Sequence, residues 1–196
     1  MKIAFFASHG GSNMQAILDA VTAGKLHATP TLLICNNPNA QAVDRANTFG
    51  MPVFVINGRT RPDEDKKDTE MANILSDAKI DIIVLAGYMK KIGSKVLSTF
   101  ANRILNIHPA LLPDFGGQGM YGMRVHEAVL AARAQKSGPT VHLVDGEYDK
   151  GRILSQRTVS VFFDDTPQSL AKRVLHEEHK IYWETLEKIV QKEIEL

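Results

Sequence analysis

The chain has 196 residues, of which 44% are hydrophobic and 23% charged, and its formal net charge is +1. These values are ordinary for one globular domain over residues 1–196, and because there is no basic excess we expect no nucleic-acid partner. No apolar run approaches the roughly 18 residues of a membrane span, so we expect none. The first residues are too short an apolar run for a signal peptide, and the single Cys35 suits a reducing compartment, so we expect a cytoplasmic protein.

Predicted strands and helices alternate through the first half of the chain. The predicted strands cover residues 2–7, 31–35, 52–56, 81–86 and 104–108, and the predicted helices cover 14–23, 40–49, 63–79 and 94–100, with Pro62 near the first position of the third helix. This alternation predicts an α/β, Rossmann-like three-layer fold with a mostly parallel central sheet. The second half predicts a helix at 125–133, a strand at 139–144, two strand segments within 153–163 at an antiparallel edge, and a last helix capped by Thr166.

The turn after the first strand, Ser8-His-Gly-Gly-Ser-Asn13, connects that strand to a helix. We expect Ser12 or Asn13 to cap the helix, and the glycines allow a ligand to approach the backbone. Exposed amides and the dipole at such a helix start suit a phosphate. A plain tight turn is the alternative, because Gly-Gly-Ser matches neither the P-loop nor the full dinucleotide fingerprint.

The strand at 104–108 places Asn106 and His108 on one face, at its carboxyl end. Pro109 cannot donate to a strand ladder, so we expect the strand to end at His108. Open α/β sheets bind ligands at this end of their strands, which makes the amide and the imidazole candidates for chemistry. The alternative for His108 is a histidine that is simply satisfied at a strand end.

Two carboxylates, Asp145 and Asp149, follow the strand at 139–144, whose carboxyl end we expect at the same edge as His108. A neighbouring carboxylate raises the pKa of an imidazole above about 6.5. An imidazolium and a carboxamide would together stabilise a developing oxyanion. The hypothesis is attack on a carbonyl by a nucleophile that the substrate supplies.

The last helix has one polar residue within its apolar stripe. The stripe consists of Leu170, Val174, Leu175, Ile181, Tyr182, Leu186, Ile189 and Val190. Glu178 occupies a position on the same face, and a buried carboxylate must be paired or line a cleft. We predict a role in a functional cleft, with a structural partner such as Arg173 as the alternative.

Metal and thiol chemistry are not indicated. His176 and His179 are three residues apart rather than four, and no third ligand is evident, so we predict no metal. Cys35 lies inside a predicted strand without an exposed base, which argues against a nucleophile.

Several short blocks together carry a resemblance to a known family. They are Gly11-Ser-Asn-Met-Gln15, Leu85-Ala-Gly-Tyr-Met89, Asn106-Ile-His-Pro-Ala-Leu-Leu-Pro113, Gly138-Pro-Thr-Val-His142, Glu147-Tyr-Asp149 and Glu178-His179. From Lys2 to about Ile189 the chain resembles the folate-dependent formyltransferases. The Gly11-Ser-Asn13 turn and the compact length resemble the phosphoribosylglycinamide branch, whose fold has an antiparallel sheet edge.

The resemblance implies transfer of the formyl group of 10-formyltetrahydrofolate to the amine of 5-phosphoribosylglycinamide, in purine biosynthesis. It implies catalysis by Asn106, His108 and Asp149, phosphate binding by Gly11, Ser12 and Asn13, and amine binding by Glu178. It implies folate binding by Met89, Lys90, Lys91, Ile92, Asn106, Asp145, Gly146, Glu147, Tyr148 and Asp149, with Thr140 and His142 supporting the folate loop. The partners would be these small molecules, and the protein a monomer or homodimer.

The chain departs from the family pattern at His9 beside the phosphate turn, at Lys90 and Lys150, and in the glycine-rich loop 116–122. Two rival hypotheses remain. One keeps the chemistry with another acceptor, such as an amino sugar nucleotide. The other is a nucleotide-binding regulatory module without catalysis.

Overall fold

The computed structural model describes residues 1–196. Its strands are β1 (Lys2–Ala7), β2 (Thr29–Cys35), β3 (Val53–Val55), β4 (Ile82–Leu85), β5 (Ile104–His108), β6 (Lys136–Ser137), β7 (Thr140–Leu143), β8 (Ile153–Gln156) and β9 (Val159–Ser160). Its helices are α1 (Ser12–Thr22), α2 (Gln41–Phe49), α3 (Glu64–Asp77), α4 (Ser94–Thr99), α5 (Met123–Ala131) and α6 (Pro167–Val190). The main sheet has the strand order β3-β2-β1-β4-β5-β7-β8, and β6 and β9 form a separate two-stranded sheet.

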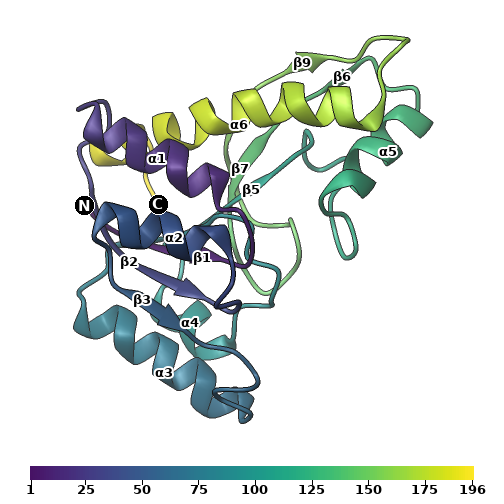
Figure 1. Ribbon diagram of the computed structural model, residues 1–196. Coiled ribbons are helices and arrows are strands. Elements are labelled where there is room, and N and C mark those ends of the chain that lie inside the picture. Colours follow the sequence, from purple (N-terminus) through teal and green to yellow (C-terminus); the bar gives the residue numbers. More distant parts are fainter. The chain divides into compact units, whose positions relative to one another are not determined.

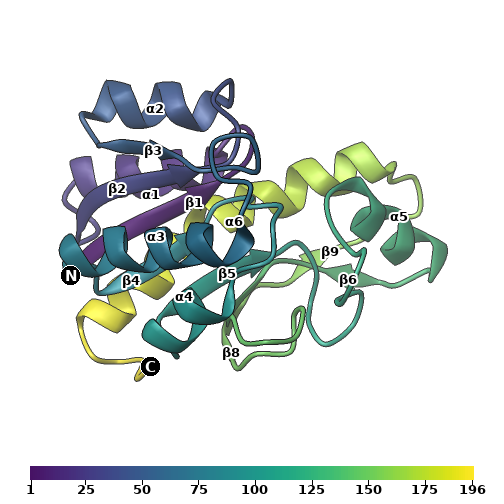
Figure 2. The same ribbon diagram turned by 90° about the horizontal axis from the view of Figure 1, so that it is seen from below.

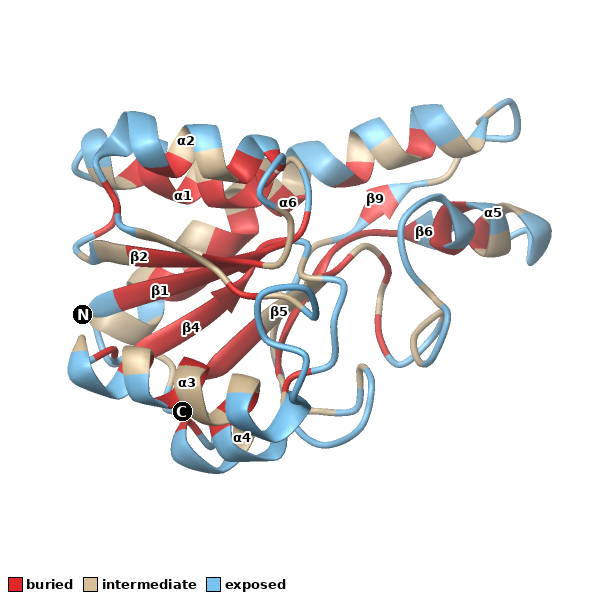
Figure 3. Ribbon diagram, turned by 60° about the horizontal axis from the view of Figure 1, so that its bottom comes forward, coloured by how far each residue is buried: buried red, intermediate tan, exposed pale blue.

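The chain divides into two compact units, one of Met1–Leu105 with Leu196 and one of Asn106–Glu195. In the first unit β1 pairs in parallel with β2 and β4, and β2 pairs in parallel with β3. Helices α1 and α2 lie on one face of these strands and α3 and α4 on the other (Figure 3). Residues 3–7 of β1 are fully buried, because a central parallel strand is covered on both faces. The predicted Rossmann-like arrangement is confirmed.

The second unit contains the antiparallel edge, because β7 pairs antiparallel with β8. Helix α5 lies beside the first turns of α6, near β6 and β9 (Figures 1 and 2). Val129, Val159, Leu170 and Val174 form a small core there. Of the two strand segments predicted within 153–163, β8 lies at the edge of the main sheet, whereas β9 pairs antiparallel with β6 instead.

The start of α1 differs from the prediction. Gly11 is the N-cap residue, with φ 65°, and no side chain caps the helix, so the expected cap by Ser12 or Asn13 is wrong. A Cβ on Gly11 would lie 2.8 Å from the Cβ of Ala42. The left-handed backbone and the close approach of α2 both require glycine at this position.

Side chains cap the first turns of α3 and α6. The Asp63 side chain accepts a hydrogen bond from the Lys66 amide, so Pro62 precedes the cap instead of occupying the first helical position. For α6 the prediction is confirmed, because Thr166 and Ser169 form a capping box and Pro167 begins the helix. The helix has no stretch long and apolar enough to cross a membrane, and neither has any other helix.

Candidate active site

The end of β5 carries the two candidate polar residues. The strand ends at His108, as the following proline predicts, and the His108 side chain is buried. Asn106, two residues earlier, is half-buried and belongs to the same face of the strand. Both residues lie in the second unit, as do all the contacts described next.

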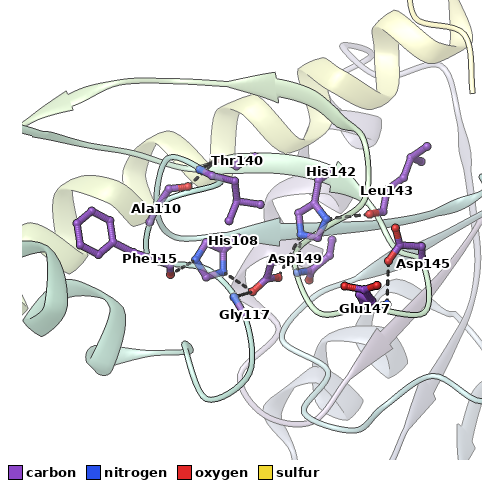
Figure 4. Close-up of polar contacts among 12 residues, drawn as sticks. His108, Ala110, Phe115, Gly117, Thr140, His142, Leu143, Asp145, Glu147 and Asp149 are labelled. Atoms are coloured by element: carbon purple, nitrogen blue, oxygen red, sulfur yellow. Dashed lines mark hydrogen bonds and ion pairs between the residues drawn. The ribbon is translucent and has the colours of Figure 1, made fainter.

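The two ring nitrogens of His108 face two acceptors (Figure 4). Nε2 lies 2.8 Å from the carbonyl oxygen of Phe115, and Nδ1 lies 3.5 Å from Oδ2 of Asp149. A carbonyl can only accept, so Nε2 donates to Phe115, and when Nδ1 is protonated as well the imidazolium forms an ion pair with Asp149. The prediction that Asp149 adjoins His108 is confirmed.

Asp149 lies between two histidines, and its backbone has φ 57°. Its Oδ2 accepts a hydrogen bond of 2.9 Å from the Gly117 amide, and its Oδ1 lies 3.5 Å from Nε2 of His142. The carboxylate therefore joins the loop after β7 to the glycine-rich loop after β5.

His142 orients Asn106. The Leu143 carbonyl can only accept, so His142 Nδ1 carries the proton of their 2.8 Å contact. Nε2 lies 3.2 Å from Nδ2 of Asn106 and 3.5 Å from Oδ1 of Asp149. When the ring is neutral, Nε2 accepts from the Asn106 amide, and when the ring is protonated, Nε2–H is directed at Asp149 instead. A carboxamide nitrogen has two N–H groups, so one stays available to a substrate oxygen.

The pKa of His108 lies below its ordinary value, so the expected rise is wrong. Burial is the largest cause, because it disfavours the charged ring, and the charge of His142 acts in the same direction. Asp149 and the Phe115 carbonyl act in the opposite direction without overcoming burial. The neutral ring therefore dominates at neutral pH.

The pKa of Asp149 also lies below its ordinary value. Burial acts to raise this pKa, but hydrogen bonds from His142 and the Gly117 amide, together with the charges of His108 and His142, outweigh it. Asp149 is therefore a carboxylate at neutral pH, which is the form that stabilises an imidazolium beside it.

The rest of the loop after β7 is open to solvent. Asp145, Gly146, Glu147 and Tyr148 are exposed, and Asp145 Oδ1 accepts a hydrogen bond from the Glu147 amide. An exposed aromatic residue, Tyr148, beside two acidic side chains is suited to a flat polar ligand. The expectation that this loop binds folate stays a prediction.

Thr140 supports a different segment from the one expected. Its hydroxyl donates to the Ala110 carbonyl at 2.6 Å and accepts from the Leu112 amide at 3.0 Å. Thr140 therefore holds the chain that follows His108, and only His142 contacts the folate-loop segment.

The candidate phosphate and folate residues of the first unit lie at its two turns after β1 and β4. Asn13 is buried and Ser12 half-buried in the first turn of α1. Met89, Lys90 and Lys91 are exposed and Ile92 is buried. The buried Ser8 hydroxyl accepts a hydrogen bond of 2.8 Å from the Met89 amide, a contact that no sequence pattern indicates.

Glu178 lies on the buried face of α6, as predicted, with 8% of its surface exposed. Arg173 bonds to Asp165 and to the Ser160 carbonyl, so it is not the partner of Glu178. Leu175, assigned to the same stripe, is exposed. No group of three or more histidine, cysteine, aspartate or glutamate side chains is arranged to hold a metal ion.

Two site residues were missed by sequence reasoning. They are Phe115, through its carbonyl, and Gly117, through its amide. Both act through backbone groups, and their only signal was a glycine-rich segment soon after the His-Pro pair.

Residues 1–186 match the model of the formyl transferase family. The chain belongs to this family. It is 44% identical over 194 residues to "Phosphoribosylglycinamide formyltransferase, chloroplastic" of Arabidopsis thaliana, covering 98% of this chain and 66% of that protein. It is 34% identical to the phosphoribosylglycinamide formyltransferase of Bacillus subtilis, covering 92% and 90% of the two chains.

The fold is similar to solved members of the family. The glycinamide ribonucleotide transformylase 1 of Symbiobacterium toebii superposes with a TM-score of 0.92 at 32% identity, covering 100% of this chain and 90% of that one. The formyltransferase fold, with its mostly parallel sheet and antiparallel edge, is thereby confirmed.

Proposed function

We propose that this protein transfers the formyl group of 10-formyltetrahydrofolate to the amine of 5-phosphoribosylglycinamide, a step of de novo purine (IMP) biosynthesis. The observation that carries the proposal is the cluster of Asn106 and His108 on β5 with Asp149 from the loop after β7, to which Asn106 is connected through His142. Relatives that match most of the chain are named for this activity. Residues 1–196 would serve as a single formyltransferase domain.

Catalysis requires stabilisation of a tetrahedral oxyanion. The amine nitrogen bonds to the formyl carbon, and the carbonyl electron pair moves to oxygen. The remaining N–H of Asn106 donates to this oxygen. The Nε2–H of protonated His108 also donates to it after exchanging the Phe115 carbonyl for the substrate, while Nδ1–H stays directed at Asp149. Loss of one such donor typically raises the barrier by about 2.7–4 kcal/mol.

Collapse of the adduct requires a proton on the departing folate nitrogen. The carbon–nitrogen bond breaks, its electron pair stays on that nitrogen, and His108 supplies the proton. The proton lost by the amine restores the imidazolium. A lowered pKa makes the imidazolium a stronger acid, while Asp149 limits the fall in its population.

The substrate ends are assigned to the remaining candidates. Gly11, Ser12 and Asn13 would hold the ribose phosphate at the start of α1, and Glu178 would hold the amine. The folate would lie against residues 89–92 and 145–149. We place the protein in the cytoplasm as a monomer or homodimer, although the plant relatives are named chloroplastic.

Turnover with defined substrates tests the proposal. We expect the pure protein to transfer the formyl group from 10-formyltetrahydrofolate to 5-phosphoribosylglycinamide. The change in folate absorbance measures this reaction. Turnover only with an amino sugar nucleotide would favour the rival acceptor, and no turnover with any acceptor would favour the regulatory module. Either result contradicts the proposal.

Glu178→Gln tests the amine assignment. The neutral side chain loses the charge-assisted bond, so we expect the KM for 5-phosphoribosylglycinamide to rise about ten- to hundredfold. The KM for the folate should stay within about twofold of the wild-type value. In the control Glu193→Gln, at an exposed position, the KM values of both substrates should stay within the same range. An equal rise for both substrates would point to a structural role.

A further inference from the structure

Arg45, on α2, is bonded to the turn that begins α1. Its Nε donates to the Gly10 carbonyl at 2.9 Å, and its Nη1 donates to Oε1 of Gln15 at 3.0 Å. Gln15 is itself oriented, because its Nε2 donates to Oδ1 of Asp19 at 2.8 Å. One guanidinium thus joins the residue before the N-cap Gly11 to the fourth residue of the helix.

The start of α2 holds the same turn at two further points. The Ala42 amide donates to the His9 carbonyl at 3.1 Å. Gly11 is so close to Ala42 that a Cβ there would clash. The turn therefore takes its shape from α2 as well as from its own glycines.

The charge of Arg45 is not neutralised by a carboxylate partner. Arg61, Arg157 and Arg173 each form an ion pair with an aspartate or glutamate. The two hydrogen-bond partners of Arg45 are a carbonyl and a carboxamide, both neutral. A guanidinium remains charged at any working pH, so a positive charge persists beside the N-terminus of α1, whose first amides have no acceptor within the helix itself.

We propose that Arg45 is a positioning residue for the phosphate of the acceptor ribonucleotide. It holds the Gly10 carbonyl in its own hydrogen bond, which keeps that acceptor from facing an anion and sets the direction of the amides that follow. Its charge adds to the helix dipole at the same place. The proposal rests on the proposed function, because it assumes that the turn binds a phosphate.

Arg45→Met removes the charge and both hydrogen bonds while keeping a helix-forming side chain. We expect inorganic phosphate to bind about tenfold more weakly, and the KM for 5-phosphoribosylglycinamide to rise about tenfold, with kcat and the folate KM within about twofold. Phosphate binding is measured by calorimetry and the two KM values by steady-state kinetics. Arg45→Lys, which keeps the charge but lacks the planar fork, should recover part of the loss.

Two further variants separate positioning from folding. Gln15→Leu removes the group that orients Arg45, so the double variant should bind phosphate no more weakly than Arg45→Met alone. Arg103→Met is the matched control, because Arg103 packs on Phe100 and bonds the Thr99 carbonyl in the same unit. Its phosphate binding should be unchanged.

Unchanged phosphate binding in Arg45→Met, or equal rises in both KM values, would overturn the inference. If Arg45→Met fails to fold by circular dichroism, Arg45→Lys and Gln15→Leu decide the matter by the same readouts. Wild-type protein that binds phosphate yet turns over no 5-phosphoribosylglycinamide would contradict the proposed function and leave the role of Arg45 standing.

Discussion

Replacing His108 by asparagine is expected to lower turnover by about 10²–10⁴-fold, the range that a general acid typically contributes. Asparagine can donate to the Phe115 carbonyl, but it cannot carry a proton to the folate nitrogen. Both substrates should still bind, because the proposed phosphate and amine contacts are unaltered. Single-turnover kinetics at saturating substrate, with binding followed separately, measures the effect.

The control for this change is His176→Asn. The His176 side chain is 70% exposed and lies 3.9 Å from Glu177, away from the contacts of His108. Turnover of this variant should match that of the wild type. A loss of less than about tenfold in His108→Asn would show that His108 is not the proton donor, because general acids contribute more than this.

Asp149→Asn is expected to lower turnover at neutral pH by about 10–10³-fold. An adjacent carboxylate shifts a pKa by about 1–3 units, so its loss lowers the imidazolium population of His108 by that factor. The substituted amide oxygen can still accept from the Gly117 amide, so the loop contact survives. The variant therefore tests the charge of Asp149 more than its packing.

The sign of the pH dependence follows from the same argument. The pKa of His108 is already lowered by burial, and without Asp149 it falls further. Activity that depends on the imidazolium is lost as pH rises through this pKa, so the alkaline limb of kcat should move to lower pH. The difference from wild type should shrink as pH falls, because both enzymes become protonated.

Two measurements check this expectation. NMR titration of the His108 ring should give a lower midpoint in Asp149→Asn, and the pH profile of kcat should shift in the same direction. Asp164→Asn, which removes an exposed carboxylate beside Arg173, should change neither. An unchanged profile with unchanged turnover would show that Asp149 does not govern His108.

Much of the candidate site was predictable because its residues lie at points that sequence marks strongly. The His-Pro pair ends a buried strand, and Glu178 interrupts an apolar helix stripe, so both stood out from their periodic surroundings. The cap of α1 was harder to predict from the sequence. Ser12 is a preferred capping residue, yet the approach of Ala42 leaves Gly11 in a left-handed backbone at that place.

The direction of the His108 pKa shift shows what reasoning from neighbouring sequence positions omits. A nearby carboxylate suggested a raised pKa, and Asp149 does act in that direction. The larger contribution is burial, which depends on how several segments pack around the ring and which no spacing between two residues reports. The roles of Phe115 and Gly117 were hidden for the same reason, because backbone groups at any residue type can make those bonds.

The sequence by itself determined the order and type of most elements, the identity of Asn106 and His108 at a strand end, and the buried position of Glu178. These follow from hydrophobic periodicity and from proline and glycine, which act locally along the chain. Only the tertiary structure decided that Asp149 contacts both His108 and His142, that Thr140 holds the segment after His108, and that Arg45 braces the turn before α1. The contacts of Asp149 with His108, of Thr140 with Ala110 and of Arg45 with Gly10 join residues 30 or more positions apart, and they depend on packing that chain periodicity does not encode.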